Sequence, residues 1–256
     1  MSADGRFVRF DLMSSDPARS QAFYGALLGW QFAVEALGGF QVTTILLDDH
    51  PLGWVVPFNV AGYPAHWMAY VAVADVDAAC AQVTALGGMV CVPPESLPGC
   101  RFAVVEDATG ALFSPVSGLD AAPSPAPVGG PCWVQLLTRD ASASLAFYRD
   151  LLAWEHTTME TLGQPPFYLF LNEAVAFASM MEKPAEAPTS ERDAWLPYFR
   201  VADVTERTTA AATLGAQVFV SPTFMPGMGG FAVLADPTGA MFALWEDAPA
   251  AATRAG

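Results

Sequence analysis

Two pairs of side chains, at matching places in the two halves of the sequence, are the strongest candidates for chemistry. They are Arg9 with Asp11 and Trp133 with Gln135. Each pair lies on a short apolar stretch, and residues two apart on a β-strand point to the same face. An arginine and an aspartate on one inward face can neutralise each other as a buried ion pair. They can equally anchor a carboxylate or phenolate while Asp11 acts as a general base, and both interpretations stay open.

A duplicated helix follows each pair. The stretch 15–30, SDPARSQAFYGALLGW, returns as the stretch 139–154, RDASASLAFYRDLLAW. In each copy an aspartate, Asp16 or Asp140, is suited to cap a helix, and apolar residues then recur at helical spacing. The strand that precedes each helix is therefore expected to line any site.

Further matching segments extend the duplication over most of the chain. Trp67 matches Trp195, and the turn DATG at 107–110 returns as DPTG at 236–239. Within each half, a strand, a helix and three strands can be read twice. In the first half we expect helices over 17–28 and 75–86 and strands over 7–13, 31–36, 40–48, 52–58, 68–74, 89–92, 101–106 and 111–116.

Two domains, 1–118 and 131–247, follow from this pattern. The segment 119–130 is rich in proline and glycine, which is typical of an extended linker. The tail 248–256 is rich in alanine and is expected to fray. Each domain is long enough to bury a core of its own.

These signatures resemble the vicinal oxygen chelate superfamily, which includes glyoxalase I, bleomycin- and fosfomycin-resistance proteins and extradiol dioxygenases. The motifs are DP…AFY…LLGW, VADVDA and EDATGALF, and the resemblance covers about residues 5–118 and 130–247. It is greatest to two-domain glyoxalase-like proteins of actinobacteria. It implies an α+β fold in which glyoxalase-like domains are duplicated in tandem, each with paired βαβββ units forming a cupped mixed sheet. A fold by itself does not give a function.

The resemblance also implies where a divalent metal would be held, by His, Gln or Glu at three positions per domain. Those positions fall on Arg9, Met68 and Ser114 in the first half and on Trp133, Leu196 and Ala243 in the second. None is a good ligand, because such cations require carboxylate, imidazole or thiolate donors. We therefore expect no metal and no other cofactor. A shifted set of His66, Asp11 and Glu106 is disfavoured, since His66 is expected in a loop and Glu106 beside a solvated turn.

Without a metal, the resemblance still implies a cup that can hold a molecule. Arg9 and Asp11 are the candidate catalytic residues, and the candidate ligand-binding residues are Trp54, Met68, Tyr70, Ser114, Trp133, Gln135 and Tyr198. Aromatic and methionine side chains with few polar groups suit a flat, mostly apolar small molecule. The alternative is that these strand residues are simply core.

Two proline- and glycine-containing loops, 93–100 and 221–230, can close over a cup mouth or can be plain hairpin connections. The glycines of the second loop precede a strand rather than a helix, which disfavours a nucleotide site.

Composition narrows the choice of partner. A net charge of −15 disfavours nucleic acid and anionic membranes, and 53% hydrophobic residues with 14% charged residues exclude general disorder. No apolar run is long enough to span a bilayer, no secretory signal pattern opens the chain, and the four cysteines form no CxxC pair. We expect a cytoplasmic protein with a small-molecule ligand, either a monomer with pseudo-dimeric domains or a homodimer.

Two classes of function stay open. The first is a metal-independent protein that binds an aromatic or hydrophobic metabolite. The second is an enzyme of the same superfamily, of lyase, isomerase or dioxygenase type, or a metal-free catalyst that uses Asp11 and Arg9. The first is favoured, because holding a molecule requires only the cup.

Overall fold

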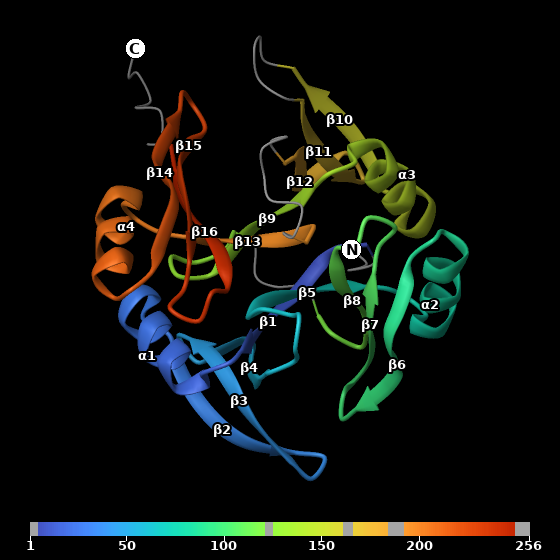
Figure 1. The fold of residues 1–256 in the computed structure, drawn as a ribbon, viewed down its shortest axis with the longest axis horizontal. Helices are drawn as coiled ribbons and strands as arrows, with labels where there is room; N and C mark the ends of the chain where they lie inside the picture. The colour runs from blue at the N-terminus through green and yellow to red at the C-terminus, as the bar shows by residue number, and fades with distance from the viewer. Residues whose placement is uncertain (1–4, 121–124, 161–165, 184–191, 249–256) are drawn as a thin grey trace, which may run out of the picture.

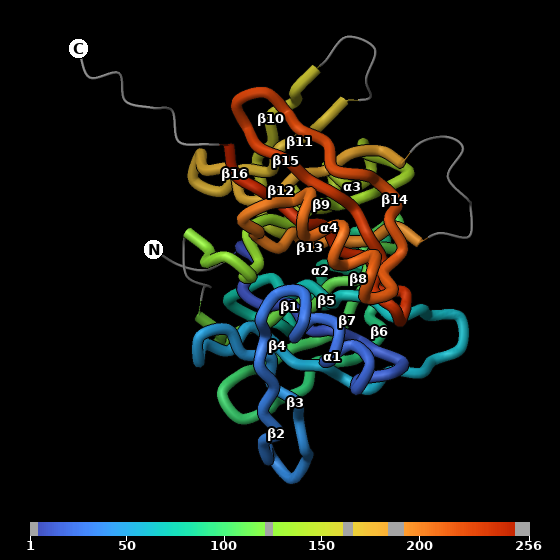
Figure 2. Tube along the Cα trace, turned by 90° about the vertical axis from the view of Figure 1, so that its left-hand side faces the viewer, coloured from blue at the N-terminus to red at the C-terminus, as the bar shows by residue number. Residues whose placement is uncertain are grey.

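Two eight-stranded sheets, each with two helices, make up the protein. The structure is a computed structural model that describes residues 5–120, 125–160, 166–183 and 192–248. The two halves of the chain stack on each other (Figure 2). The fold is thus the expected α+β tandem duplication, while the tail and part of the linker lie outside the described residues.

The first sheet has the strand order β2-β3-β4-β1-β5-β8-β7-β6. Its elements are β1 Phe7–Ser14, α1 Pro17–Leu28, β2 Gln31–Leu37, β3 Phe40–Leu47, β4 His50–Pro57, β5 His66–Ala72, α2 Val76–Ala85, β6 Met89–Leu97, β7 Cys100–Glu106 and β8 Leu112–Ser117. Strands β1 and β5, which each open a βαβββ unit, pair antiparallel at the centre of the sheet.

The second sheet repeats this order as β10-β11-β12-β9-β13-β16-β15-β14 (Figure 1). Its elements are β9 Pro131–Thr138, α3 Ala141–Leu152, β10 Glu155–Met159, β11 Phe167–Asn172, β12 Val175–Glu182, β13 Ala194–Arg200, α4 Val204–Thr213, β14 Gln217–Met225, β15 Gly229–Ala235 and β16 Met241–Asp247. No helix among the described residues is long and apolar enough to cross a membrane.

The duplicated helices begin where the sequence predicts. The carboxylate of Asp16 accepts a hydrogen bond from Arg19 N, and Asp140 accepts one from Ala143 N, so both helix starts are capped. Helix α1 ends at Gly29, whose φ of +75° is the left-handed conformation that glycine adopts at low cost.

Both proline-containing loops proved to be mostly strand. β6 runs to Leu97 rather than ending at residue 92, and β14 likewise extends to Met225. Each lies at the edge of its sheet, where a proline removes no required ladder hydrogen bond. The expectation of long loops over 93–100 and 221–230 was therefore wrong.

The helix-bearing faces of both sheets share one continuous apolar core, and each half has in addition a smaller apolar cluster of its own. Helix α1 lies beside α4, and α3 beside α2 (Figure 1). The ring of Tyr24 on α1 lies 5.5 Å from that of Phe242 in the second half, and Tyr148 on α3 lies 5.7 Å from Phe113 in the first. Helices α1 and α3 thus pack against the other half's sheet as well as their own.

Buried hydrogen bonds join the halves within this core. Tyr148 accepts a bond from Trp195 Nε1 at 2.8 Å and donates to Asp107 Oδ2 at 2.9 Å. Within the first half, Trp67 Nε1 donates to Tyr24 at 3.1 Å. Burial raises the pKa of Tyr24 most, and the negative charge of Asp236 in the second half raises it further. The two DxTG turns are therefore docking points for the opposite half.

Removing the hydroxyl in Tyr148→Phe should destabilise the fold. The change leaves Trp195 Nε1 and Asp107 Oδ2 buried without partners, and each such group costs about 1–3 kcal/mol. We expect the free energy of unfolding in urea to fall by about 2–5 kcal/mol. Tyr168→Phe on β11 is the matched control, because the Tyr168 hydroxyl has no partner within the described part of the chain. An equal loss in both variants would contradict the role given to the interface bond.

Candidate functional site

A small cleft opens on the concave face of the first sheet. It is lined by Arg9, Asp11, Trp54, Tyr70, Leu97, Cys100, Phe102, Val116 and Leu119. Its free volume is about 20 Å³, which is room for about one water molecule. Two charged side chains and one phenol hydroxyl thus face an otherwise apolar space.

Asp11 is the buried centre of this cleft. Its side chain is 1% exposed, and Oδ1 accepts hydrogen bonds from Arg9 Nε and from Trp54 N, both at 2.7 Å. Gly53 makes this approach possible, because a Cβ there would lie 1.9 Å from the Phe10 carbonyl oxygen and 2.9 Å from Asp11 Oδ1. The sequence therefore brings β4 unusually close to β1 beside the carboxylate.

Arg9 is held between two aromatic rings. Its guanidinium carbon lies 3.8 Å from the centre of the Trp54 ring and 5.7 Å from that of Tyr70. Cation–π contacts of this kind stabilise a desolvated guanidinium. Burial raises the pKa of Tyr70, and the charge of Asp11 together with a side-chain interaction with its carboxylate raises it further, so this phenol stays protonated at neutral pH.

Two polar atoms in the cleft have no partner within the described residues, Arg9 Nη2 and Asp11 Oδ2. Leaving a buried donor or acceptor unpaired costs about 1–3 kcal/mol, and more when the group is charged. A water molecule or a ligand in the cleft would satisfy both atoms.

The matching polar residues of the second half are hydrogen-bonded to one another. Tyr198 donates to Gln135 Oε1 at 2.7 Å, and Trp133 Nε1 donates to Ser179 Oγ at 2.8 Å. By the strand registers, Ser179 on β12 occupies the position that Trp54 occupies on β4. The indole of the second half is therefore that of Trp133 on β9, the strand equivalent to β1. Leu196, Tyr198 and Ala243 are buried in one apolar cluster with Trp133 at its edge.

The two remaining predicted residues of the first half, Met68 and Ser114, are neighbours of Asp11 and Tyr70 on adjacent strands but do not line the cleft. Met68 is 3% exposed in an apolar cluster on the same face, and Ser114 is fully buried with its hydroxyl donating to the Ala103 carbonyl at 2.6 Å. Sequence reasoning missed five lining residues, Leu97, Cys100, Phe102, Val116 and Leu119. The alternation of Cys100 and Phe102 along β7 was the available signal.

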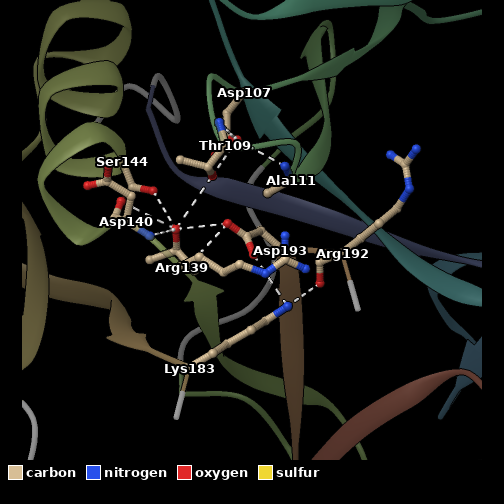
Figure 3. Close-up of polar contacts among 10 residues, drawn as sticks. Asp107, Thr109, Ala111, Arg139, Asp140, Ser144, Lys183, Arg192 and Asp193 are labelled. Carbon is tan, nitrogen blue, oxygen red and sulfur yellow. Dashed lines mark hydrogen bonds and ion pairs between the residues drawn. The ribbon is translucent and has the colours of Figure 1, made fainter. Parts of the chain in front are cut away.

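A second polar cluster lies at the junction of the halves (Figure 3). The Thr138 hydroxyl is 3.0 Å from Asp193 Oδ2, 3.0 Å from Ser144 Oγ and 3.5 Å from the Thr109 hydroxyl of the first half. Asp193 is buried, and its other oxygen lies 3.4 Å from Lys183 Nζ. Because these side chains form hydrogen bonds and an ion pair with one another, the cluster has a structural role and connects the two halves.

The residues present do not fit the divalent metal that the superfamily resemblance implies. Arg9 is itself a cation, Met68 offers only a thioether, and the Ser114 hydroxyl is already bonded to the backbone. No group of three or more His, Cys, Asp or Glu side chains that could hold a metal occurs in the described ranges. The donor set is therefore wrong for such a cation.

The shifted ligand set also does not converge. His66 is in strand β5 rather than in a loop and pairs with Met13, whereas Asp11 pairs with Met68. Glu106 is 9% exposed, not solvated, and accepts hydrogen bonds from Arg192 and from the Tyr63 hydroxyl. The expectations of a loop at His66 and of a solvated Glu106 were therefore both wrong. Glu106 is buried because Arg192 of the second half covers this end of β7.

Comparison with known sequences places this geometry in a family. The chain matches the family model "Glyoxalase-like domain" twice, over residues 8–115 and 133–245. "Putative glyoxylase CFP32" of Mycobacterium tuberculosis (strain CDC 1551 / Oshkosh) is 29% identical over 247 residues, which are 93% of this chain and 94% of that protein. "Anthracycline biosynthesis protein DnrV" of Streptomyces peucetius is 29% identical over 129 residues, 46% of this chain and 47% of that protein.

Solved structures share the fold at low sequence identity. A Mn(II)-bound glyoxalase from Novosphingobium aromaticivorans has a TM-score of 0.65 and 16% identity, with 96% of this chain and 83% of that chain covered. The 2,3-dioxygenase LapB from Pseudomonas sp. KL28 has a TM-score of 0.65 and 14% identity, with 97% and 94% covered. Those structures share the fold, and the two tandem family matches show that the chain belongs to the glyoxalase-like domain family.

Proposed function

We propose that the protein binds a small, mostly apolar molecule in the cleft of its first half, without a metal. The observation that carries this proposal is the unpaired donor and acceptor, Arg9 Nη2 and Asp11 Oδ2, at the base of a cleft with apolar walls. Polar groups that converge in an otherwise apolar concavity are the usual composition of a small-molecule site. Trp54 and Tyr70 contribute the aromatic walls.

The second half has a supporting role in this proposal. Gln135 and Trp133 already have partners in Tyr198 and Ser179, and apolar side chains fill the space around them. A ligand there would have to break two buried hydrogen bonds before forming its own. The second cup therefore stabilises the fold.

An enzymatic role is the second candidate, favoured by the same Asp11. A carboxylate with one oxygen fixed and the other unpaired is suited to take a proton from a bound molecule. The names of the relatives are compatible with such chemistry. Binding is preferred, since it requires no further groups.

The partner and the location are part of the proposal. A net charge of −15 supports a small molecule over a nucleic acid or an anionic membrane. All four cysteines are free thiols, which supports a reducing compartment such as the cytoplasm.

A screen of small aromatic and aliphatic metabolites by thermal shift tests the binding site. Arg9→Ala should abolish any stabilisation by a hit, because it removes the donor and one cleft wall, while the unliganded protein still melts cooperatively. Arg101→Ala is the matched control, since Arg101 forms an exposed pair with Asp77. Hits that stabilise wild type and Arg9→Ala equally would show binding elsewhere.

The second cup should respond differently. Trp133→Ala removes the donor to Ser179 and leaves a void, so we expect a loss of about 3 kcal/mol in unfolding free energy. Ligand-induced shifts should persist in this variant at a temperature where it is folded. Loss of the shift without loss of stability would reverse the roles of the two cups.

Divalent metal should not stabilise the protein. A site filled at a hundred times its dissociation constant would add about 2.7 kcal/mol, which a melting curve detects. We expect no rise in Tm with added Ni²⁺, Zn²⁺, Mn²⁺ or Fe²⁺. One tightly bound metal ion per chain after mild purification, measured by elemental analysis, would refute metal independence.

A further inference from the structure

We propose that the Arg9–Asp11 pair recognises a single neutral hydroxyl group, so that the ligand is a small phenol or alcohol rather than an anion. The inference rests on the proposed function and specifies the chemistry of the same cleft. Its basis is that this buried ion pair forms only one of the two hydrogen bonds that an arginine and a carboxylate can share.

A second arginine–aspartate pair in the chain gives the comparison. At the surface, Arg101 uses Nε and Nη2 to bind both oxygens of Asp77, each at 2.8 Å. Inside the cleft, Arg9 uses Nε to bind Asp11 Oδ1 at 2.7 Å, while Nη2 and Oδ2 have no partner in the part of the chain described. The two atoms that would complete a bidentate pair are therefore available to a third group.

Neighbouring backbone and rings hold the pair in this open form. Asp11 Oδ1 also accepts from Trp54 N at 2.7 Å, which fixes the orientation of the carboxylate. The guanidinium is stacked over the Trp54 ring at 3.8 Å, which fixes its plane. Since one residue restrains both partners, the open geometry is built in before any ligand arrives.

A hydroxyl group matches these two atoms with a single oxygen. It can accept from Arg9 Nη2 and donate to Asp11 Oδ2, and the free volume of about 20 Å³ admits a group of that size. A carboxylate brings acceptors but no donor, and it would be buried beside the charge of Asp11. An ammonium group brings donors but no acceptor and would meet Arg9.

The apolar walls fix where the rest of the molecule lies. Leu97, Phe102, Val116 and Leu119 line the cleft beyond the ion pair. Because the free volume admits only the hydroxyl, the short hydrocarbon or single ring attached to it would contact these walls from the open side of the cleft. The second half offers no such receptor, because Gln135 Oε1 already accepts from Tyr198 at 2.7 Å.

Isothermal titration calorimetry of the full chain with phenol, toluene and benzoate tests the inference. Phenol should bind wild type at least about tenfold more tightly than either other probe, a factor that corresponds to about 1.4 kcal/mol. In Asp11→Asn, one oxygen can still accept from Arg9 Nε and Trp54 N, but the acceptor for the hydroxyl proton is lost and the pair becomes cationic. Phenol affinity should therefore fall about tenfold and benzoate affinity should rise. Asp77→Asn, in the surface pair, should match wild type.

Each contrary outcome has a distinct meaning. Equal affinities of phenol and toluene for wild type would overturn hydroxyl recognition but leave the cleft as a ligand site. Benzoate binding as tightly as phenol would assign the cleft to anions. Unchanged phenol affinity in Asp11→Asn, or no binding of any probe, would overturn the inference, while the metabolite screen with Arg9→Ala decides separately whether the cleft binds ligand.

Discussion

The buried hydrogen bond between Tyr148 and Asp107 is the contact on which the arrangement of the two halves depends. Asp107 Oδ1 accepts from Thr109 N, the Thr109 hydroxyl and Ala111 N, which shape the turn, and Oδ2 is left for the tyrosine of the other half. Burial is the largest influence on this carboxyl and raises its pKa, despite four hydrogen bonds that act in the opposite direction. A carboxylate in this environment requires every one of those donors, so the halves cannot separate without a large cost.

This constraint explains what the duplicated motifs do. The tyrosine of each AFY motif and the aspartate of each DxTG turn meet across the interface, and the tryptophan that ends each motif donates to a backbone carbonyl of the other half. Trp30 Nε1 bonds to the Gly129 carbonyl at 2.8 Å, and Trp154 Nε1 bonds to the Gly5 carbonyl at 2.7 Å. The features that identify the family are therefore structural here, and they say little about chemistry.

The interface between the halves buries one face of each sheet and leaves the other face accessible. Phe10 and Leu12 of β1 are buried in the shared core, while Arg9 and Asp11, on alternate positions, face the cleft. A change on the core side would disturb both halves together, whereas a change on the concave side alters only one cup. The two halves accordingly repeat the tyrosine, tryptophan and DxTG residues of the interface, whereas the polar residues of the two cups differ.

Much of this could be predicted from the sequence, because caps, turns and two-residue alternation are local signals. Asp16 and Asp140 predicted the helix starts correctly, and the alternation of Arg9 and Asp11 along β1 predicted a common face. The shared core could not be predicted, since apolar spacing on α1 shows that a face is buried but not which sheet covers it. The extension of β6 through Pro93 and Pro94 was missed because its edge position is a property of the whole sheet. The roles of the site residues stay predictions.

The difference between the cups comes from where a single indole is attached. In the first half it is Trp54 on β4, and β1 carries Arg9 at the position that Trp133 occupies on β9, with the charge of Arg9 paired to Asp11. In the second half it is Trp133 on β9, and the facing strand carries only Ser179, which the indole N–H can reach. Gln135 is then sufficient, because an uncharged amide can be satisfied by Tyr198 alone. An indole on β4 therefore leaves room beside β1 for a charged pair, whereas an indole on the central strand forms a hydrogen bond within its own sheet, so the same scaffold carries different polar groups in its two halves.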